Sequence, residues 1–341
     1  MRMIIVAFAF IGMTIFPLIG SYWFFRKLKS DVLYINQDRV RDPRYFASSF
    51  TCMMDKQWEK YQGGETLQLS KNERILVADA VKEYPNPCEA VIIADKVDFI
   101  APAQFEFQKE IYAKQDAYLK ELIQVRAIAC KGEVRIERDV NIVRWADAIG
   151  SMYIGDDCDL GICVSSMKEL VIGNGCRFRR LYAPRIFLGQ QEKIAVESVE
   201  DRIASLNDYN LLNKIKYNVR YVDDTMVNGN GIVDNSIVSK YDLTVLENIT
   251  VNGNLRTRKR LRICDNAIIS GNIFAEEDIW IGRNSVILGN VFSQENIIVE
   301  QGAVIGKENS RISVVARGSL SFEKNCVVYG YVSNEQGGMT L

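Results

Sequence analysis

Histidine is absent from the 341 residues of this chain. Its absence removes the most frequent general base of enzymes and the side chain that most often changes charge near neutral pH. It also removes a common zinc ligand. The sequence therefore indicates no catalytic centre, and we expect neither a metal nor a cofactor.

Other chemical signals are also missing. The 8 cysteines are scattered without a CxxC pair, which provides neither a zinc-binding spacing nor a small disulfide framework, so we expect reduced thiols. The short Gly229-Asn-Gly231 is not a phosphate-binding loop. Lysine and arginine number 42 against 43 acidic residues, a balance of -1 that does not favour nucleic acid as a partner.

The longest charge-free run lies near the N-terminus, in residues 3–25 (MIIVAFAFIGMTIFPLIGSYWFF). As a helix it would span about 35 Å, at ~1.5 Å per residue, enough for a hydrocarbon core of ~30 Å. The run is too long for the core of a signal peptide, and no clear cleavage site is present. We predict that residues 1–30 are a single-pass transmembrane anchor. Its predicted interface residues are Trp23, Arg26, Lys27 and Lys29.

Flanking charges predict the orientation of this anchor. Only Arg2 and the α-amine precede the apolar run, whereas several arginines and lysines follow it. The positive-inside rule then places the rest of the chain on the cytoplasmic side of the inner (cytoplasmic) membrane. A glycosylation triplet at Asn248 points weakly the other way.

The second half of the chain contains a repeat of 18 residues. The sequences NITVNGN (248–254), NAIISGN (266–272) and NSVILGN (284–290) follow one another at that period. Each is followed by aliphatic and small residues in one pattern, as in Ile273-x-Ala275-x-x-x-Ile279-x-Ile281. The pattern also begins at Ile237 and, after an insertion, at Val314.

The first half repeats the pattern more loosely. Its units begin at Ile92, Ile111, Ile128, Ala146, Val164 and Leu181. In the Ile92 unit we assign Val97 and Phe99 as the second inward pair. Cys158 and Cys176 lie one period apart, which predicts that their thiols are stacked.

Strict alternation is typical of short strands with one buried face, and a fixed short period is typical of a solenoid. We therefore predict an all-β fold, a parallel β-solenoid in which coils of three short strands stack at ~4.8 Å. The repeat also aligns two columns of identical residues, one of glycines and one of asparagines. Gly253, Gly271 and Gly289 are expected to supply turn conformations, and Asn254, Asn272 and Asn290 to form a hydrogen-bonded ladder.

The pattern also predicts the domain organisation. After the anchor, we expect a juxtamembrane or capping region (31–89), a first solenoid block (90–189), a partly helical insertion (190–236), a second block (237–332) and a tail (333–341). In 31–89, Asp42-Pro43 is a helix-start signal, and aromatic residues from Phe46 to Tyr61 follow at helical spacing. In the insertion, residues 199–211 suggest a helix on the flank of the solenoid, and residues 219–236 leave room for a degenerate coil.

The repeat resembles the bactofilins, a family of polymer-forming cytoskeletal proteins. Residues 263–282, ICDNAIISGNIFAEEDIWIG, are similar to the family's recurring V-x-G-x-I-x-A-x-x-V-x-I unit. The resemblance covers 237–332 well and 90–189 loosely. It implies a right-handed triangular β-helix that polymerises end to end without nucleotide, and some members of the family carry an N-terminal membrane segment.

Two classes of enzyme also build solenoids. Hexapeptide acyltransferases generally rely on a catalytic histidine, which this chain lacks. Pectin-lyase-like enzymes use clustered carboxylates on longer coils. Acidic clusters occur here at Asp156, Asp157 and Asp159 and at Asp223-Asp224, but at solenoid turns such residues are more typical of solvated corners than of a catalytic or calcium site.

A cationic stripe is predicted in one coil. Arg256, Arg260 and Arg262 flank inward aliphatic residues and are expected to point outward. This stripe has two interpretations. It is either a face that keeps the protein soluble, or a contact with anionic lipid or an acidic partner. Near an anionic membrane, each charge would contribute ~1 kcal/mol to binding.

The end of the second block carries no evident cap. Phe322, Val328 and Tyr331 are therefore predicted to form an end-to-end polymerisation contact. In the alternative, the N-terminal helix or the tail from Ser333 covers this end.

These features predict a membrane-anchored, bactofilin-like structural protein. It would assemble end to end as a homopolymer, contact membrane lipid and recruit unidentified protein partners, such as envelope or cell-wall machinery. The alternative is a monomeric solenoid module that binds a polysaccharide or a protein. Outward aromatic residues, Phe274, Trp280 and Phe292, leave that choice open.

Overall fold

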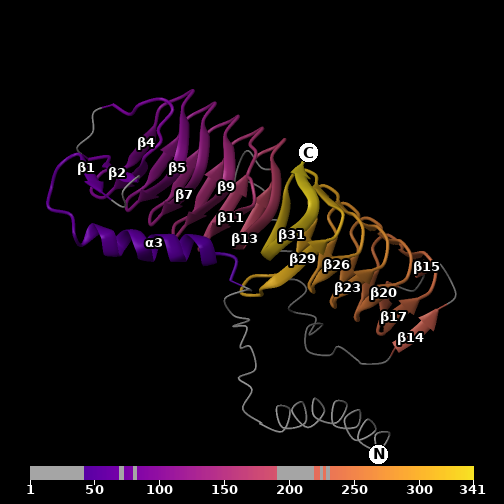
Figure 1. Cartoon of the computed structure of the whole chain (residues 1–341). Coiled ribbons are helices and arrows are strands. Elements are labelled where there is room, and N and C mark those ends of the chain that lie inside the picture. The colour runs from indigo at the N-terminus through magenta and orange to yellow at the C-terminus, as the bar shows by residue number, and fades with distance from the viewer. Residues whose placement is uncertain (1–41, 69–72, 80–82, 190–218, 223–225, 228–230) are drawn as a thin grey trace, which may run out of the picture. The chain divides into compact units, whose positions relative to one another are not determined.

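The computed structural model describes residues 42–68, 73–79, 83–189, 219–222, 226–227 and 231–341 (Figure 1). Residues 43–341 form one compact unit. The predicted anchor and its interface residues Trp23, Arg26, Lys27 and Lys29 lie outside the described residues, as do residues 190–218 of the predicted insertion. In the described ranges, no helix is both long and apolar enough to cross a membrane.

A parallel β-solenoid in two blocks confirms the β-solenoid part of the predicted fold (Figure 1). The first block has two main faces. One face contains β2 (Arg74–Val77), β3 (Val91–Ala94), β5 (Glu106–Ala113), β7 (Gln124–Cys130), β9 (Asn141–Ala148), β11 (Cys163–Ser166) and β13 (Arg177–Leu188). The other contains β4 (Phe99–Ala101), β6 (Ala117–Leu119), β8 (Val134–Ile136), β10 (Met152–Ile154), β12 (Glu169–Ile172) and the end of β13.

The second block has three faces that share one last strand, β31 (Cys326–Thr340). The first face contains β14 (Val219–Val222), β17 (Ser236–Ser239), β20 (Leu255–Thr257), β23 (Ile273–Ala275), β26 (Val291–Ser293) and β29 (Ile312–Ala316). The second contains β15 (Met226–Val227), β18 (Leu243–Val245), β21 (Leu261–Ile263), β24 (Ile279–Ile281), β27 (Ile297–Val299) and β30 (Ser319–Phe322). The third contains β16 (Ile232–Val233), β19 (Thr250–Val251), β22 (Ile268–Ile269), β25 (Val286–Ile287) and β28 (Val304–Ile305).

The strand register follows the predicted repeat. Leu255 pairs with Ile273 and Ile273 with Val291, so aliphatic side chains of successive coils stack in one buried column. The Ile92 unit differs from the prediction. Phe99 and Ala101 are its buried pair, whereas Val97 is exposed, because the corner of this coil (95–98) holds one residue more than the corner of the next coil (114–116).

The asparagine ladder is confirmed. The Nδ2 of Asn272 donates to Oδ1 of Asn254 (3.3 Å), and the Nδ2 of Asn290 donates to Oδ1 of Asn272 (2.9 Å). Asparagine also supplies the left-handed turn residue of three successive coils in the second block, with φ of 59° at Asn248, 57° at Asn266 and 52° at Asn284.

The glycine column has a different reason from the predicted one. A Cβ on Gly271 would meet the carbonyl group of Gly253, and a Cβ on Gly289 would meet that of Gly271. These glycines permit a close approach of successive coils, and the positive φ belongs to the asparagines.

One helix covers the outside of the first block. Helix α3 (Tyr45–Trp58) begins after Asp42-Pro43, with Arg44 as its N-cap residue. Met54 is fully buried in a satellite cluster that includes Tyr112 and the partly buried Phe50. The helix therefore lies along the flank of the coils, where it contacts β7 and β9. Phe46, assigned to the same apolar stripe, is 66% exposed.

The antiparallel strand pair β1 (Thr66–Gln68) and β2 begins the first block, ahead of the predicted start at residue 90. Tyr84 packs against Phe99 and Phe107 at this first end, with ring centroids 6.2 Å from each. In this part of the chain, the first coil is therefore covered by its own residues.

The two blocks join through their C-terminal ends. Strand β13 pairs antiparallel with β31, from Arg177 opposite Met339 to Leu188 opposite Cys326 (Figure 1). Residues 333–340, predicted to be a tail, are strand residues of the last coil. The second block also begins at β14, which pairs with β17 as the degenerate coil suspected in 219–236. We call the β13–β31 contact the joint.

Burial protects most of the thiols. All 8 cysteines are free, and Cys52 is the exposed one among them. Burial raises the pKa of the Cys130 thiol and of the Cys326 thiol to about 12. The thiolate is the reactive form, so we expect a thiol reagent such as DTNB to modify Cys52 rapidly in the native protein. The Cys130 and Cys326 thiols should react only after unfolding, and their rapid modification in the native state would contradict the buried placement.

Candidate functional site

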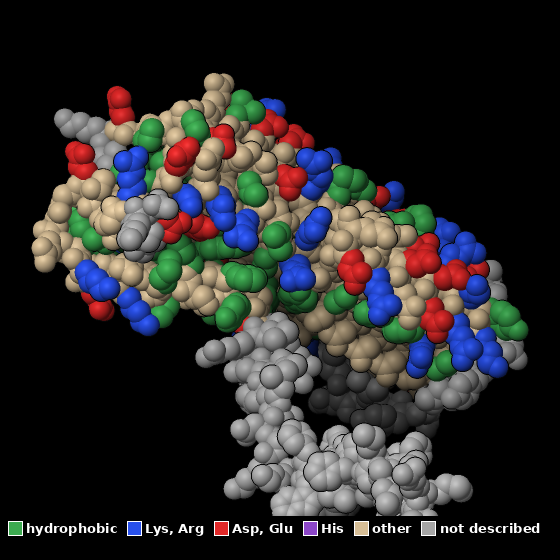
Figure 2. Space-filling model, in the orientation of Figure 1, with side chains coloured by type: hydrophobic (Ala, Val, Ile, Leu, Met, Phe, Trp, Pro, Cys, Tyr) green, Lys and Arg blue, Asp and Glu red, His purple; other side chains and the backbone are tan. Residues whose placement is uncertain are grey.

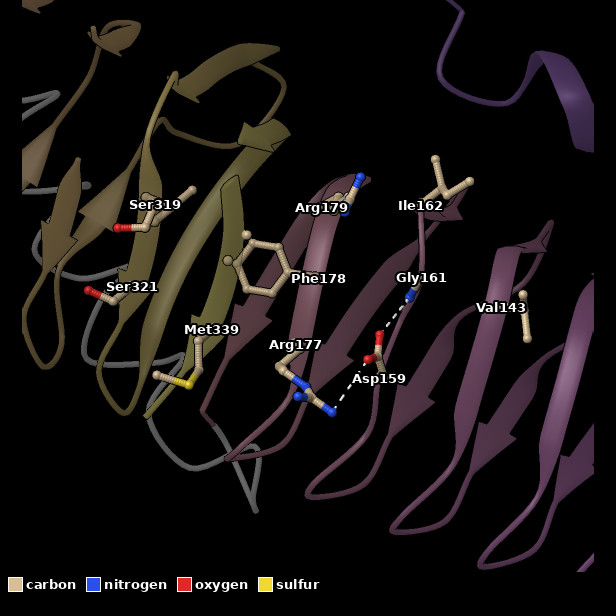
Figure 3. Close-up of a pocket in the computed structure, with 13 residues that line it drawn as sticks. Val143, Asp159, Gly161, Ile162, Arg177, Phe178, Arg179, Ser319, Ser321 and Met339 are labelled. Atoms are coloured by element: carbon tan, nitrogen blue, oxygen red, sulfur yellow. Dashed lines mark hydrogen bonds and ion pairs between the residues drawn. The ribbon is translucent and has the colours of Figure 1, made fainter. Parts of the chain in front are cut away.

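A groove crosses the joint on one side of the solenoid (Figure 3). It has a volume of about 610 Å³, and residues of both blocks line it. The first block contributes Val143, Asp159, Gly161, Ile162 and Arg177–Arg179, and the second contributes Ser319–Ser321 and Gly337–Met339. We call this hollow the cross-joint groove.

Unequal corners of the two blocks account for the groove. Phe178 pairs with Gly338 and Arg180 with Ser333, so one residue separates these positions on β13, whereas residues 334–337 separate them on β31. Because the corner on β31 is longer than the corner on β13, the two backbones do not stay paired between these positions. We call this mismatch in the joint the step. Gly338 is required at this step, because a Cβ on it would meet the ring of Phe178.

Asn334 holds the step together. It is a buried residue whose Nδ2 donates to the carbonyl oxygens of Phe178 (3.5 Å) and Arg179 (3.2 Å). Among the described atoms, its Oδ1 has no hydrogen-bond partner. The NH₂ group and the oxygen of a buried amide usually both form hydrogen bonds. The unpaired oxygen of Asn334 therefore distinguishes the joint from the regular coils.

The charges of the groove are mainly positive. The guanidinium of Arg177 lies 3.5 Å from the Asp159 carboxylate, and both side chains are well exposed, so this pair is weak. Asp159 also accepts a hydrogen bond from the backbone N–H of Gly161 (3.2 Å). Arg179, farther along β13 in the lining of the same groove, is also exposed (Figure 3). Over the visible face as a whole, side chains of both signs are interleaved (Figure 2).

A second hollow lies on the outer face of the first block, with a volume of about 620 Å³. Tyr118, Arg135 and Tyr153 are successive residues of one outward column there. The Arg135 guanidinium lies over the ring of Tyr153, 5.3 Å from its centroid. The ring face of Tyr153 is thus occupied by its neighbour in the column and is not free to stack on a ligand.

The predicted polymerisation residues lie within the joint. Val328 pairs with Ile186 and Tyr331 with Tyr182 of the same chain. Phe322 is fully buried, and its ring centroid lies 6.2 Å from that of Phe178. The prediction of a free end at these residues is therefore wrong for the folded chain, because the first block and the strand 333–340 cover that end.

The predicted cationic stripe does point outward. Arg256, Arg260 and Arg262 are all exposed. Arg260 donates from Nη2 to Oδ2 of Asp242 (2.9 Å), and this hydrogen bond lowers the pKa of Asp242. The guanidinium groups of Arg256 and Arg262 lie over the rings of Phe274 and Trp280. Their contact with lipid or an acidic partner stays a prediction.

The remaining chemical candidates are structural. Cys158 and Cys176 are buried neighbours, as predicted, and the hydrogen bond between the thiols together with burial raises the pKa of Cys176. Asp156 accepts a hydrogen bond from the backbone N–H of Asn174 (2.8 Å) at a corner. Asp223-Asp224 lie outside the described residues. Within the described part of the chain, no cluster of three potential ligands could hold a metal ion.

The joint and its groove were not predicted from the sequence. One signal was available, since the alternation of the last coil continues past residue 332 to Val332-x-Asn334 and Gly338-x-Thr340, which pair with β29 and β30. Nothing in the sequence indicated that β13 would be its antiparallel neighbour.

No family model, curated protein or solved structure matches this chain. The fold and the groove define its class, a β-solenoid protein of two blocks joined by their C-terminal ends.

Proposed function

We propose that this chain is a non-catalytic structural protein of the bactofilin type. In this function the N-terminal anchor holds the solenoid at the cytoplasmic face of the inner membrane. The solenoid assembles with further copies through one end and recruits partner proteins. Two or more anchors in one assembly increase its avidity for the membrane.

One observation supports assembly through an end. Strands β14, β15 and β16 each pair on one side only, with β17, β18 and β19, and no strand of the described residues pairs with their outer edges. Ile232, on β16, is 58% exposed at this edge. Exposed edges are normally blocked by charge, proline or a cap unless they pair with another chain.

The same observation limits the geometry of assembly. The C-terminal ends of both blocks are used in the joint, and β1 with Tyr84 covers the start of the first block. In the described part of the chain, one end then remains for contact with a second copy. Two identical ends that pair with each other form a closed dimer, whereas a filament needs a second, different surface.

The test is the oligomeric state of the full chain in a mild detergent, measured by sedimentation velocity over a range of concentrations. We expect a dimer that is lost in Ile232→Glu, because a charge at the edge opposes pairing. Ile149→Glu is the matched control, since Ile149 is 46% exposed on a corner of the first block. This control should remain dimeric.

Other outcomes separate the alternatives. Monomers at all concentrations would contradict assembly and favour a monomeric binding module, which the cross-joint groove supports. Nucleotide-independent filaments in electron micrographs would support a scaffold and contradict closure through a single end.

A further inference from the structure

Unpaired arginines line one corner of the first block beside the cross-joint groove. Arg144, Arg179 and Arg180 are all exposed. None of their guanidinium groups has an ion-pair, hydrogen-bond or ring partner among the described residues. The backbone N–H of Ile162 donates to the carbonyl oxygen of Arg144 (2.8 Å), which fixes this corner against the coil that contributes to the groove.

Exposed apolar side chains also line the groove. Val143 and Ile162 are each 46% exposed and Met339 is 41% exposed, and all three line the groove. Ile162 and Arg179 belong to the first block and Met339 to the second, as Figure 3 shows. The lining of the groove thus combines exposed apolar side chains with Arg177 and Arg179, in a chain whose formal net charge is -1.

From this combination we infer that the cross-joint groove docks an extended, acidic segment of a partner protein. An extended segment directs alternate side chains to opposite sides. Aliphatic residues can then contact Ile162 and Met339 while acidic residues face Arg179 and its neighbours. The volume of about 610 Å³ lies within the range of ligand sites, about 300–1,000 Å³.

The electrostatic part of this recognition acts mainly on encounter and specificity. Exposed cations attract an acidic partner and disfavour a basic one, and salt screens the effect over about 10 Å at 0.1 M. The apolar contacts supply the part of the affinity that salt does not screen. Docking at this groove does not depend on assembly through β14–β16, because the two surfaces lie at different ends of the second block.

Fluorescence anisotropy on the full chain tests the inference. The probe is a fluorescein-labelled eight-residue peptide of alternating glutamate and leucine, compared with a peptide of alternating lysine and leucine. We expect saturable binding of the acidic peptide, weakened by salt, and at least tenfold weaker binding of the basic one. Arg179→Glu should weaken the acidic peptide at least tenfold, and Ile162→Ser should weaken it severalfold.

Arg138→Glu is the matched control, because Arg138 is an exposed arginine of the first block at another corner, beside Asp139. This variant should bind the acidic peptide as the unaltered chain does. Circular dichroism checks that all variants keep the fold. Equal binding by Arg179→Glu and Arg138→Glu would overturn the inference. Binding unaffected by Ile162→Ser and equalled by single-stranded DNA or anionic vesicles would also overturn it, since it would show general charge attraction only.

Discussion

Replacing Arg44 with alanine is expected to lower the free energy of unfolding by about 3–5 kcal/mol. The Nε and Nη2 of Arg44 donate to the two carboxylate oxygens of Asp147, at 2.6 and 2.7 Å. The side chain of Asp147 is only 4% exposed. Without Arg44, a buried carboxylate keeps one hydrogen bond, from Oγ of Ser165 (2.6 Å), and loses the charge that compensates it.

The measurement is urea denaturation followed by circular dichroism, with limited proteolysis to detect release of helix α3. The double variant Arg44→Ala with Asp147→Ala should be less destabilised than Arg44→Ala, because no buried charge remains unpaired. Lys131→Ala is the control, since its ion pair with Asp55 is exposed and is worth about 1 kcal/mol or less. Equal losses in Arg44→Ala and Lys131→Ala would contradict the buried pair.

Truncation of Phe322 should have a similarly large effect, because this side chain is fully buried at the joint against Phe178. Phe322→Ala is expected to cost about 3–5 kcal/mol of stability, since it leaves a cavity in the core. Phe292→Ala is the matched control. The ring of Phe292 is only half-buried and stacks outside the solenoid on Phe274, with centroids 5.4 Å apart, so its loss should cost about 1 kcal/mol.

Urea denaturation of the three proteins measures both effects. Equal losses for the inner and the outer phenylalanine would contradict the placement of Phe322 in the core of the joint. The burial of Phe322 also affects how a charged substitution at this position is interpreted. Phe322→Arg would disrupt the fold of the chain itself, so a loss of assembly in that variant would not locate a contact between copies.

The outward arginines show how far the repeat could predict a candidate site. Alternation placed Arg256, Arg260 and Arg262 on the outside, and they are exposed there. Alternation carries no information about partners one coil away. The pairing of Arg260 with Asp242 and the position of Arg256 over Phe274 depend on which side chains stack in one column. Both pairs lie 18 residues apart, so the period predicts that these side chains stack, whereas the hydrogen bond and the ring contact depend on side-chain conformations that only the folded chain shows.

Helix α3 was likewise predictable from the sequence, but its packing was not. The apolar spacing from Phe50 to Trp58 predicted a helix, because it places these side chains on one face. It did not predict where that face would pack. The cluster around Met54 and Tyr112 places the helix on the flank of the coils, and the bond between Arg44 and Asp147 fixes its start. These partners are separated by up to 103 residues in the chain.

The sequence by itself determined the solenoid, its period of 18 residues and the columns of buried aliphatic residues and asparagines. Those features depend on neighbouring coils, and a fixed period places the same residue types in contact at every coil. Only the tertiary structure decided that β13 pairs with β31 and that a groove crosses their joint. That contact is antiparallel and joins corners of different length, so no repeat in the sequence encodes it. It depends on which strand edges remain unpaired when both blocks have formed.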